Sequence, residues 1–326
     1  PESKGNGSKY DLNDRSKFSI TLDLKNDESI NELKKLIGQV DAVFEGFRPG
    51  VMEKLGLGPN DLLSINEKLV YGRMTGWGQE GVFSDMAGHD LNYLSITGAL
   101  NAIGRKDERP PVPLNLIADY GGGGMLLAVG MLSALIHSQK TGKGQVVDAA
   151  MIDGTSMLMS LFYSFYGSGV WANERESNLL DGAAHFYDTY ECKDGKYIAV
   201  ACIEDKFYKE MLDKLEITDE KFSKQFSKDI WPELKSKLGE KFLSKNRDEW
   251  AMIFKNSDAC ITPILDLDEA PKHEHNKSRS TFTERDGVVQ PNPSPRFSET
   301  PLEIKSSPKK IGEDNILISE KYNINL

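Results

Sequence analysis

Cysteine is scarce in this sequence, since Cys192, Cys202 and Cys260 are the three thiols among 326 residues. Three widely spaced cysteines make neither a disulfide framework nor a zinc cluster, so we predict no metal site and interpret them as structural residues of a reducing compartment. No apolar run reaches the length of a membrane span, and no signal peptide is visible. The sequence therefore predicts no membrane association.

Positive charge is also in short supply. The 40 Lys and Arg residues are outnumbered by 50 Asp and Glu residues, which gives a formal net charge of -10 and a pI near 5.2. A general nucleic-acid-binding protein needs a basic surface, so this composition predicts no nucleic-acid partner. Any anionic ligand must be held by a local cationic pocket.

Several familiar catalytic motifs are missing from the sequence. It contains no P-loop, no dinucleotide fingerprint, no nucleophile elbow and no zinc-type histidine pair. His273 and His275 are two residues apart, but they lie in a polar segment and are expected to be solvated. Any catalytic chemistry must come from a different set of residues.

Apolar and polar stretches alternate through residues 18 to 73 in the strand-helix-strand rhythm of a parallel sheet. With 39% hydrophobic residues, the chain can bury a sizeable core. We predict the α/β class, with an open parallel sheet in a large domain and a second, smaller α+β domain. The five alternating stretches are Phe18–Leu24, Ile30–Ile37, Ala42–Phe44, Val51–Leu57 and Leu69–Arg73.

Changes in composition predict the domain boundaries. We expect a large α/β domain over residues 1–172, a polar linker over 173–185, a small α+β domain over 186–280 and a return segment over 281–326. A hairpin around the turn Asp194-Gly195 opens the small domain. Helices near 206–215, 231–243 and 247–255 and a strand over Cys260–Ile264 follow it.

Two candidate proton carriers, His89 and Asp119, each stand where a loop opens a helix. Asp90 follows His89 and falls in a first helical turn, near backbone N–H groups that have no partner inside the helix. Four glycines follow Asp119, and glycine lets backbone and ligand approach closely. An isolated Gly-His-Asp sequence is more often part of a core, so the functional interpretation depends on further residues.

Arg48 lies at the carboxyl end of a predicted strand, where open α/β sheets place their ligands. It is a candidate phosphate contact, and the alternative is a surface arginine beside a turn. Methionines gather further along the chain, and their adaptable side chains suit either a core or a pliable wall for acyl chains. These are Met125, Met131, Met151, Met157 and Met159.

A series of motifs in order resembles the α-methylacyl-CoA racemases, which belong to the class III CoA-transferase superfamily. The likeness extends from about residue 15 to the end of the chain. It implies the class III CoA-transferase fold, an acyl-CoA thioester as substrate and an interlocked homodimer. Family members begin with a further strand-helix-strand that contributes to the CoA site, and we expect that element to be missing here. The motifs are Glu45-Gly-Phe-Arg-Pro-Gly50, Met74-Thr-Gly-Trp-Gly-Gln79, Gly88-His-Asp90, Gly104-Arg-Lys-Asp-Glu-Arg-Pro110, Asn115-Leu-Ile-Ala-Asp119, Gly142-Lys-Gly-Gln145 and Tyr187-Asp-Thr-Tyr190.

The resemblance implies inversion of the carbon next to a thioester carbonyl, through an enolate. His89 and Asp119 would be the acid and the base on opposite faces of that carbon. Glu204 would pair with Asp119, because two neighbouring carboxyls tend to share one proton. Glu45 would orient the histidine, and the backbone N–H of Asp90 would lie near the thioester oxygen.

The resemblance also implies where CoA binds. Arg48 is the best candidate for a phosphate contact, and weaker candidates for the CoA site are Arg73, Arg15, Lys17, Gly121 and Gly122. No separate cofactor is expected, since CoA is part of the substrate. The ending Asn323-Ile-Asn-Leu326 is no clear peroxisomal address, so we expect a cytoplasmic protein, or a peroxisomal or mitochondrial one in a eukaryote.

Two alternatives remain open at this point. In CoA transferases of the same superfamily, the residue matching Asp119 is a nucleophile that forms an anhydride and then an enzyme thioester. A transferase has no need of an imidazole facing that aspartate, so His89 favours the racemase. The second alternative is a CoA-thioester-binding or scaffold protein without activity.

Overall fold

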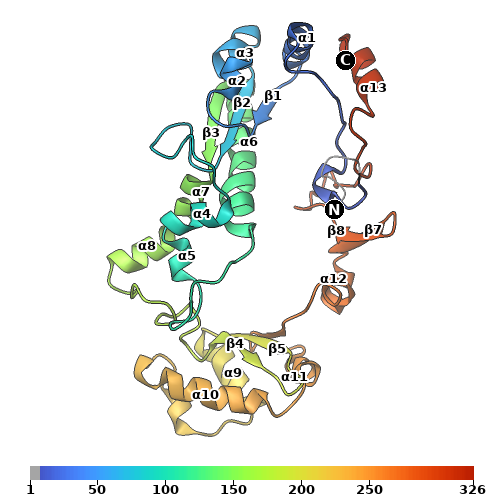
Figure 1. Cartoon of the computed structure of the whole chain (residues 1–326). Coiled ribbons are helices and arrows are strands. Elements are labelled where there is room, and N and C mark those ends of the chain that lie inside the picture. The colour runs from blue at the N-terminus through green and yellow to red at the C-terminus, as the bar shows by residue number, and fades with distance from the viewer. Residues whose placement is uncertain (1–7) are drawn as a thin grey trace. The chain divides into compact units, whose positions relative to one another are not determined.

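A small sheet of three strands forms the centre of the first part of the chain, in a computed structural model that describes residues 8–326 (Figure 1). Strand β1 (Ala42–Glu45) pairs in parallel with β2 (Val70–Thr75), and β3 (Gln145–Ala150) lies on the other side of β2. Two helices, α2 (Val51–Lys54) and α3 (Pro59–Ile65), connect β1 to β2. The predicted strand-helix-strand rhythm and the α/β class are confirmed.

Helices cover this sheet. Helix α1 (Asp27–Ile37) packs with α2 and α3 around the buried side chains of Leu57, Leu62 and Tyr71. Helix α6 (Leu126–Thr141) packs against β2 and β3, and Figure 1 shows it running alongside them. A side chain at Gly72 would come within 2.5 Å of the Met131 sulfur, so the glycine lets α6 lie close to β2. The residues of this second contact are Val70, Leu127, Met131, Ala134 and Ala149.

The expected strand over Phe18–Leu24 is wrong. The segment pairs with no other strand, and side chains from the end of the chain hold it instead. Asp314 accepts the Ser19 N–H at 2.8 Å, and Asn315 accepts the Thr21 N–H at 2.9 Å. An alternating pattern is typical of a strand with one buried and one exposed face, but a strand also needs a neighbouring strand in matching register.

The return segment belongs to the first unit, together with the beginning of the chain. Arg15 donates to Gln290 at 2.8 Å and to the Pro291 carbonyl at 2.9 Å. This end of the chain contains β7 (Phe282–Arg285) paired antiparallel with β8 (Val288–Pro291). The helices at this end are η5 (Ala270–Lys272), α12 (Glu274–Ser278) and α13 (Asn315–Tyr322), while η1 (Leu12–Asp14) precedes Arg15 near the beginning of the chain.

The second unit begins with a layer of helices that holds the two candidate proton carriers. Its centre is a π-helix, η2 (Leu116–Met125), packed against α4 and α7. A side chain on Gly154 of α7 would come within 1.8 Å of the Gly122 carbonyl oxygen, so paired glycines allow this crossing. The helices around η2 are α4 (Asp90–Ile96), α5 (Ala99–Ala102), α7 (Met151–Leu158) and α8 (Ser160–Gly167).

The second unit also contains the predicted α+β part. The hairpin of β4 (Tyr187–Glu191) and β5 (Tyr197–Ala201) is confirmed, and β6 (Ile261–Pro263) pairs antiparallel with β5. Its core is aromatic, with Phe186, Phe222 and Trp250 fully buried. The helices are α9 (Asp205–Lys214), η3 (Glu220–Ser223), η4 (Lys228–Ile230), α10 (Trp231–Phe242) and α11 (Arg247–Phe254).

The compact units divide the chain differently from the predicted domains. Of the described residues, one unit comprises 8–75, 127–149 and 265–326, and the other comprises 76–126 and 150–264. The predicted large domain over 1–172, whose first seven residues lie outside the described part, thus contributes to both units. The reason is tertiary: residues 150–167 pack on the helices of 90–125, a contact that composition does not reveal.

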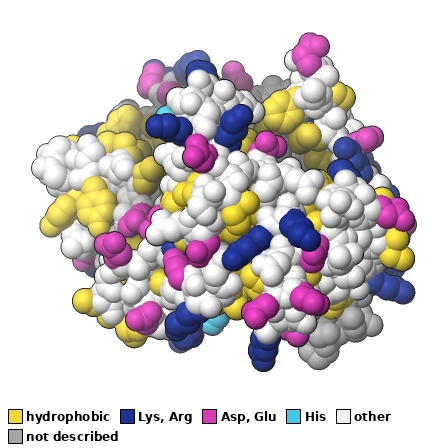
Figure 2. Space-filling model, turned by 90° about the horizontal axis from the view of Figure 1, so that it is seen from above, with side chains coloured by type: hydrophobic (Ala, Val, Ile, Leu, Met, Phe, Trp, Pro, Cys, Tyr) yellow, Lys and Arg dark blue, Asp and Glu magenta, His cyan; other side chains and the backbone are white. Residues whose placement is uncertain are grey.

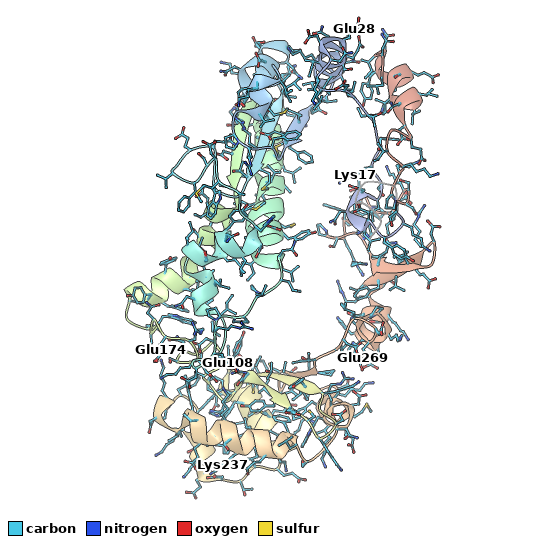
Figure 3. All side chains as sticks on the ribbon, in the orientation of Figure 1. Lys17, Glu28, Glu108, Glu174, Lys237 and Glu269 are labelled. Carbon is cyan, nitrogen blue, oxygen red and sulfur yellow. The ribbon has the colours of Figure 1, made fainter. Side chains whose placement is uncertain are left out.

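Hydrogen bonds attach the predicted linker to the loop around residues 105–108. Arg175 donates to the Glu108 carbonyl at 2.7 Å and to the Arg105 carbonyl at 2.9 Å. Figure 3 shows the segment of Glu174 beside the loop of Glu108. The linker is therefore part of the second unit.

One apolar stretch is longer than expected. The π-helix η2 continues into α6, and the combined helix Leu116–Thr141, 26 residues long, could cross a membrane by length and composition. The expectation that no stretch reaches this length is wrong. Core helices of soluble proteins pass the same criteria, and here Leu127, Met131 and Ala134 are buried against the sheet. A single helix of this kind is weak evidence for a membrane span.

Charges of both signs are mixed on the surface. Figure 2 shows lysine and arginine side chains interspersed with aspartate and glutamate on the face that it displays. Figure 3 labels charged side chains of both signs, among them Lys237 and Glu269. Such a surface fits the acidic but mixed composition of the sequence.

Candidate functional site

His89 is held by its backbone, while its side chain is free. It is the N-cap residue of α4, and the Asn92 side chain accepts its backbone N–H at 3.1 Å. The imidazole is exposed and has no hydrogen-bond partner among residues 8–326. Gly88 fixes the approach of the chain, because a Cβ there would come within 2.7 Å of the Tyr93 ring and 3.0 Å of Trp77.

Asp119 lies in the first turn of the π-helix and is half-buried. Its carboxylate accepts a hydrogen bond from the Asn115 side-chain amide at 3.2 Å. Burial raises the pKa of the neighbouring Tyr93 hydroxyl, and the negative charge of Asp119 raises it further. Irregular π-turns are frequent at functional sites, because they redirect side chains that an α-helix would space evenly.

Asp90 connects the two candidate proton carriers. One oxygen of its buried carboxylate accepts the Ala118 N–H at 2.8 Å and the Asp119 N–H at 2.9 Å. Its own backbone N–H has no acceptor in the part of the chain that the structure describes. His89 and Asp119 therefore come from adjacent segments of one unit, and the prediction that they act on one carbon atom stays a prediction.

Two of these site residues have roles that the sequence did not assign. Asn115 contacts Asp119 from four positions earlier, a spacing that puts side chains on one helical face. Tyr93 borders Asp119 and covers Gly88. The Asn115 contact could have been predicted from that spacing, but the Tyr93 contact depends on how α4 crosses η2.

Glu204 makes no hydrogen bond or ion pair with Asp119 among the described residues. It is the exposed N-cap residue of α9, and no described side chain pairs with its carboxylate. It lies near Cys260. Burial raises the pKa of that thiol, and the negative charge of Glu204 raises it further. The predicted pairing of Glu204 with Asp119 stays a prediction.

Glu45 and Arg73 form a buried ion pair in the first unit. The Arg73 Nε lies 3.1 Å from one Glu45 oxygen, and the Phe47 N–H donates to the other at 2.7 Å. Arg73 also binds Glu53 through both Nη atoms, at 2.7 and 3.2 Å. Burial acts to lower the pKa of Arg73, but its bonds to Glu53 and Glu45 raise it overall.

The candidate CoA contacts differ in how available they are. Arg48 is exposed and has no charged partner among the described residues, whereas Arg73 is 7% exposed and fully paired. Arg15 is bonded to the return segment, and Lys17 lies 3.1 Å from Asp14. A phosphate would reach Arg73 at the expense of an existing ion pair, so the geometry favours Arg48.

The glycines after Asp119 serve a further purpose. Gly122 is buried, and a Cβ there would meet the Thr155 backbone nitrogen at 2.6 Å. Its missing side chain therefore serves the contact between η2 and α7. The predicted contact of CoA with Gly121 and Gly122 is a separate matter and stays a prediction.

An apolar cavity of about 420 Å³ lies between η2, α5, α7 and α8. Ile117, two residues before Asp119, contributes to its wall. A neighbouring cavity of about 300 Å³ shares Met159, Phe162 and Trp171 with it. Cavities of this size and character suit the apolar part of a small molecule.

Comparisons with known proteins identify the family of the chain. Residues 1–315 match the family CoA-transferase family III. The chain is 43% identical to human alpha-methylacyl-CoA racemase, covering 97% of this chain and 84% of that one, and 42% identical to the mouse protein of that name, covering 94% and 81%. A succinyl-CoA–L-malate CoA-transferase beta subunit from Chloroflexus aurantiacus is 28% identical, covering 96% and 80%.

Solved structures agree on the fold. A CAIB/BAIF family protein from Brucella suis superposes with a TM-score of 0.80 at 26% identity, covering 95% of this chain and 82% of that one. Fold, family match and the much higher identity to the racemases than to the transferase point the same way. The chain belongs to CoA-transferase family III, and within that family it groups with the α-methylacyl-CoA racemases.

Proposed function

We propose that the protein is a racemase that inverts the α-carbon of 2-methylacyl-CoA thioesters. His89 and Asp119 exchange protons with that carbon from opposite faces, and an enolate is the intermediate. The observation that carries the proposal is the Asp90 carboxylate, which joins the segment of the exposed imidazole to that of the half-buried carboxyl. Inversion needs two such groups, because a base that takes a proton from one face cannot return it to the other.

Asp90 contributes the stabilisation of negative charge. Asp90 is the first residue of α4, directly after His89, and its backbone N–H has no acceptor among the described residues. A donor directed at the thioester oxygen stabilises the enolate more than the ground state, typically by about 10²–10³ in rate. This is the oxyanion contact that the family resemblance implies.

Two glutamates complete the proposed acid-base arrangement. Glu204 has an exposed and unpaired carboxylate, which leaves it able to pair with Asp119 of its own or of a partner chain. Glu45 has its carboxylate direction fixed by Arg73 and the Phe47 N–H, a rigid setting for a group that orients His89. Both roles follow the resemblance.

Substrate binding divides between a cationic and an apolar part. Arg48 binds the CoA phosphates in this proposal, with Arg15, Lys17 and Arg73 in supporting positions and with backbone contacts at Gly121 and Gly122. The cavity beside Ile117 takes the apolar acyl chain, and Met159 in its wall adapts to chains of different shape. No cofactor takes part in the proposed reaction beyond the CoA of the substrate.

A homodimer is part of the proposal. The outer face of α6 exposes Val129, Leu132 and Ile136, each more than half accessible, while the opposite face packs on the sheet. A stripe of three large apolar residues on one helix favours burial against another protein surface, and the resemblance favours a second copy in an interlocked arrangement. We propose a cytoplasmic location, or a peroxisome or mitochondrion in a eukaryotic source.

Solvent exchange tests the proposed reaction. The enzyme is incubated in deuterium oxide with a single enantiomer of a 2-methylacyl-CoA and without any carboxylate acceptor, and mass spectrometry and chiral analysis follow the α-hydrogen. We expect deuterium at the α-carbon together with inversion. A parallel incubation contains a carboxylic acid acceptor, and CoA transfer to it without α-deuteration in either incubation would contradict the racemase and support the transferase. CoA-thioester binding without either reaction would support a binding protein.

A further inference from the structure

The Asp90 carboxylate is buried in an unusual setting. The residue is 6% exposed, yet no cation lies within bonding distance of it among residues 8–326. One carboxylate oxygen accepts two backbone N–H groups, and the other is buried without a partner. A buried carboxylate is costly unless hydrogen bonds compensate for lost water, so this one is held in place for what it contacts.

Its contacts lie at the start of the π-helix rather than in its own helix. The first N–H groups of a helix have no partner inside it, and Asp90 supplies the acceptor for those of Ala118 and Asp119 from 28 and 29 positions away. The carboxylate thus caps η2 from a distance. The negative charge also suits the positive end of the helix.

This contact acts on the catalytic pair as a unit. Asp90 is the next residue after His89, and its side chain is bonded to the backbone of Asp119. Asn115 restrains the Asp119 carboxyl at the other end. A change at Asp90 would therefore alter the separation of the imidazole and the carboxyl without touching either.

We propose that the Asp90 side chain is a positioning group that sets the spacing of His89 and Asp119, in addition to the role of its backbone N–H. The inference rests on the proposed racemase function of these two residues. The carboxylate takes no proton and touches no substrate atom. It works by holding the first turn of η2 at a fixed distance from the start of α4.

Two substitutions separate the position of this group from its charge. Asp90→Asn keeps an oxygen for both N–H groups and removes the charge, whereas Asp90→Ala removes the acceptor. Thr97→Ala is the matched control, because Thr97 is buried at the end of the same helix and its hydroxyl donates at 2.9 Å to the Leu94 carbonyl. The hydroxyl also accepts the Ala99 N–H at 3.5 Å, so that truncation deletes two buried hydrogen bonds, neither of which involves η2.

We expect Asp90→Ala to lower kcat for α-proton exchange by about 10²-fold with little change in KM, since small displacements of reacting groups cost about that much. Asp90→Asn recovers most of the rate, and Thr97→Ala leaves kcat close to that of the parent. A kcat for Asp90→Ala no lower than that for Thr97→Ala would overturn the proposal. An inactive Asp90→Asn with an intact η2 would overturn it as well, because charge and not position would then matter.

Amide hydrogen exchange supplies a readout that is independent of turnover. In the parent protein and in Asp90→Asn, the N–H groups of Ala118 and Asp119 should be protected, and in Asp90→Ala they should exchange at least tenfold faster. Unchanged protection in Asp90→Ala would sink the inference even if activity fell. If the parent protein lacks racemase activity altogether, the proposed function fails, while the exchange data still decide whether Asp90 holds Asp119.

Discussion

The side chain of Asp90 accepts the backbone N–H of Asp119 at 2.9 Å across 29 positions of sequence. This hydrogen bond links the two proposed proton carriers, because Asp90 directly follows His89 and binds the backbone of Asp119. Around it, Gly88 and Gly122 allow backbone and ring to approach where a methyl group would not fit. The site is therefore built from close backbone packing as well as from reactive side chains.

Removal of either proposed proton carrier, His89 or Asp119, should strongly slow inversion. His89→Ala and Asp119→Asn should each lower the rate of α-deuteration by at least about 10²–10⁴-fold, the usual contribution of a positioned acid or base. Asp119→Asn keeps the size of the side chain and its contact with Asn115. His275→Ala, at an exposed histidine in the other unit, is the control and should leave the rate unchanged. Turnover that survived both site substitutions would refute the assignment.

Gly88→Ala should displace His89. The added methyl would lie 2.7 Å from the Tyr93 ring and 3.0 Å from the Trp77 indole, and relief of that overlap costs about 1–3 kcal/mol. We expect both a lower urea midpoint and a proton-exchange rate reduced by at least tenfold. Gly167→Ala, where nothing lies within 4 Å, should change neither. Equal behaviour of the two variants would contradict the packing described for Gly88.

The glycines after Asp119 should differ sharply in their tolerance of alanine. At Gly122 the new Cβ would meet the Thr155 backbone nitrogen at 2.6 Å, so we expect a loss of about 2–4 kcal/mol in the free energy of unfolding. At Gly124 the nearest atom is 3.6 Å away, and alanine should be neutral or slightly stabilising because it favours the helix. Denaturant unfolding of the two variants measures the difference. Similar midpoints would show that η2 and α7 separate easily.

His185 should make stability depend on pH. It is fully buried, its Nε2 lies 2.7 Å from the Tyr208 hydroxyl, and burial lowers the pKa of the imidazole to about 4. Protons then bind the unfolded chain first, so the stability that the neutral imidazole provides is present above pH 6.5 and is lost as the pH falls from 6.5 to 4. A shift of this size corresponds to at most about 3 kcal/mol.

Urea unfolding at pH 7 and pH 4.5 measures this effect. His185→Gln, which keeps a polar side chain without a titrating ring, should lose less stability between the two pH values than the parent protein does. The comparison uses the change with pH and not the absolute stability, since the substitution also disturbs the aromatic core. The same loss in both proteins would assign the pH dependence to other groups.

Asp188 should be important for stability. Its carboxylate is almost fully buried and binds Arg105 at 2.6 Å and Lys235 at 2.7 Å. Asp188→Asn would remove one of the two carboxylates that Arg105 and Lys235 share, the other being that of Glu176. We expect a cost of about 2 kcal/mol once the partial exposure of Arg105 is allowed for. Asp205→Asn, in an exposed pair with Lys209, should cost less than about 0.5 kcal/mol. Equal costs would mean that Asp188 is as well solvated as Asp205.

Hydrophobic periodicity and turn residues in the sequence predicted most of the helices and strands. The hairpin at Asp194-Gly195 and the strands near 42–45 and 70–75 are where alternating patterns and turn residues put them. The failures have one cause. The segment Phe18–Leu24 has the pattern of a strand but no neighbour, and the packing of residues 150–167 on 90–125 redraws the domain boundary.

The sequence alone determined which candidate groups the chain carries. The proposed proton carriers His89 and Asp119, the arginine Arg48 after a strand and the motifs that mark the family can all be identified in it. Folding decided which of these groups meet. Only the tertiary structure brings the Asp90 carboxylate to the start of η2 and buries Arg73 between Glu45 and Glu53. Local patterns record what a residue can do, whereas contacts between distant segments depend on how helices cross, and no local pattern encodes that crossing.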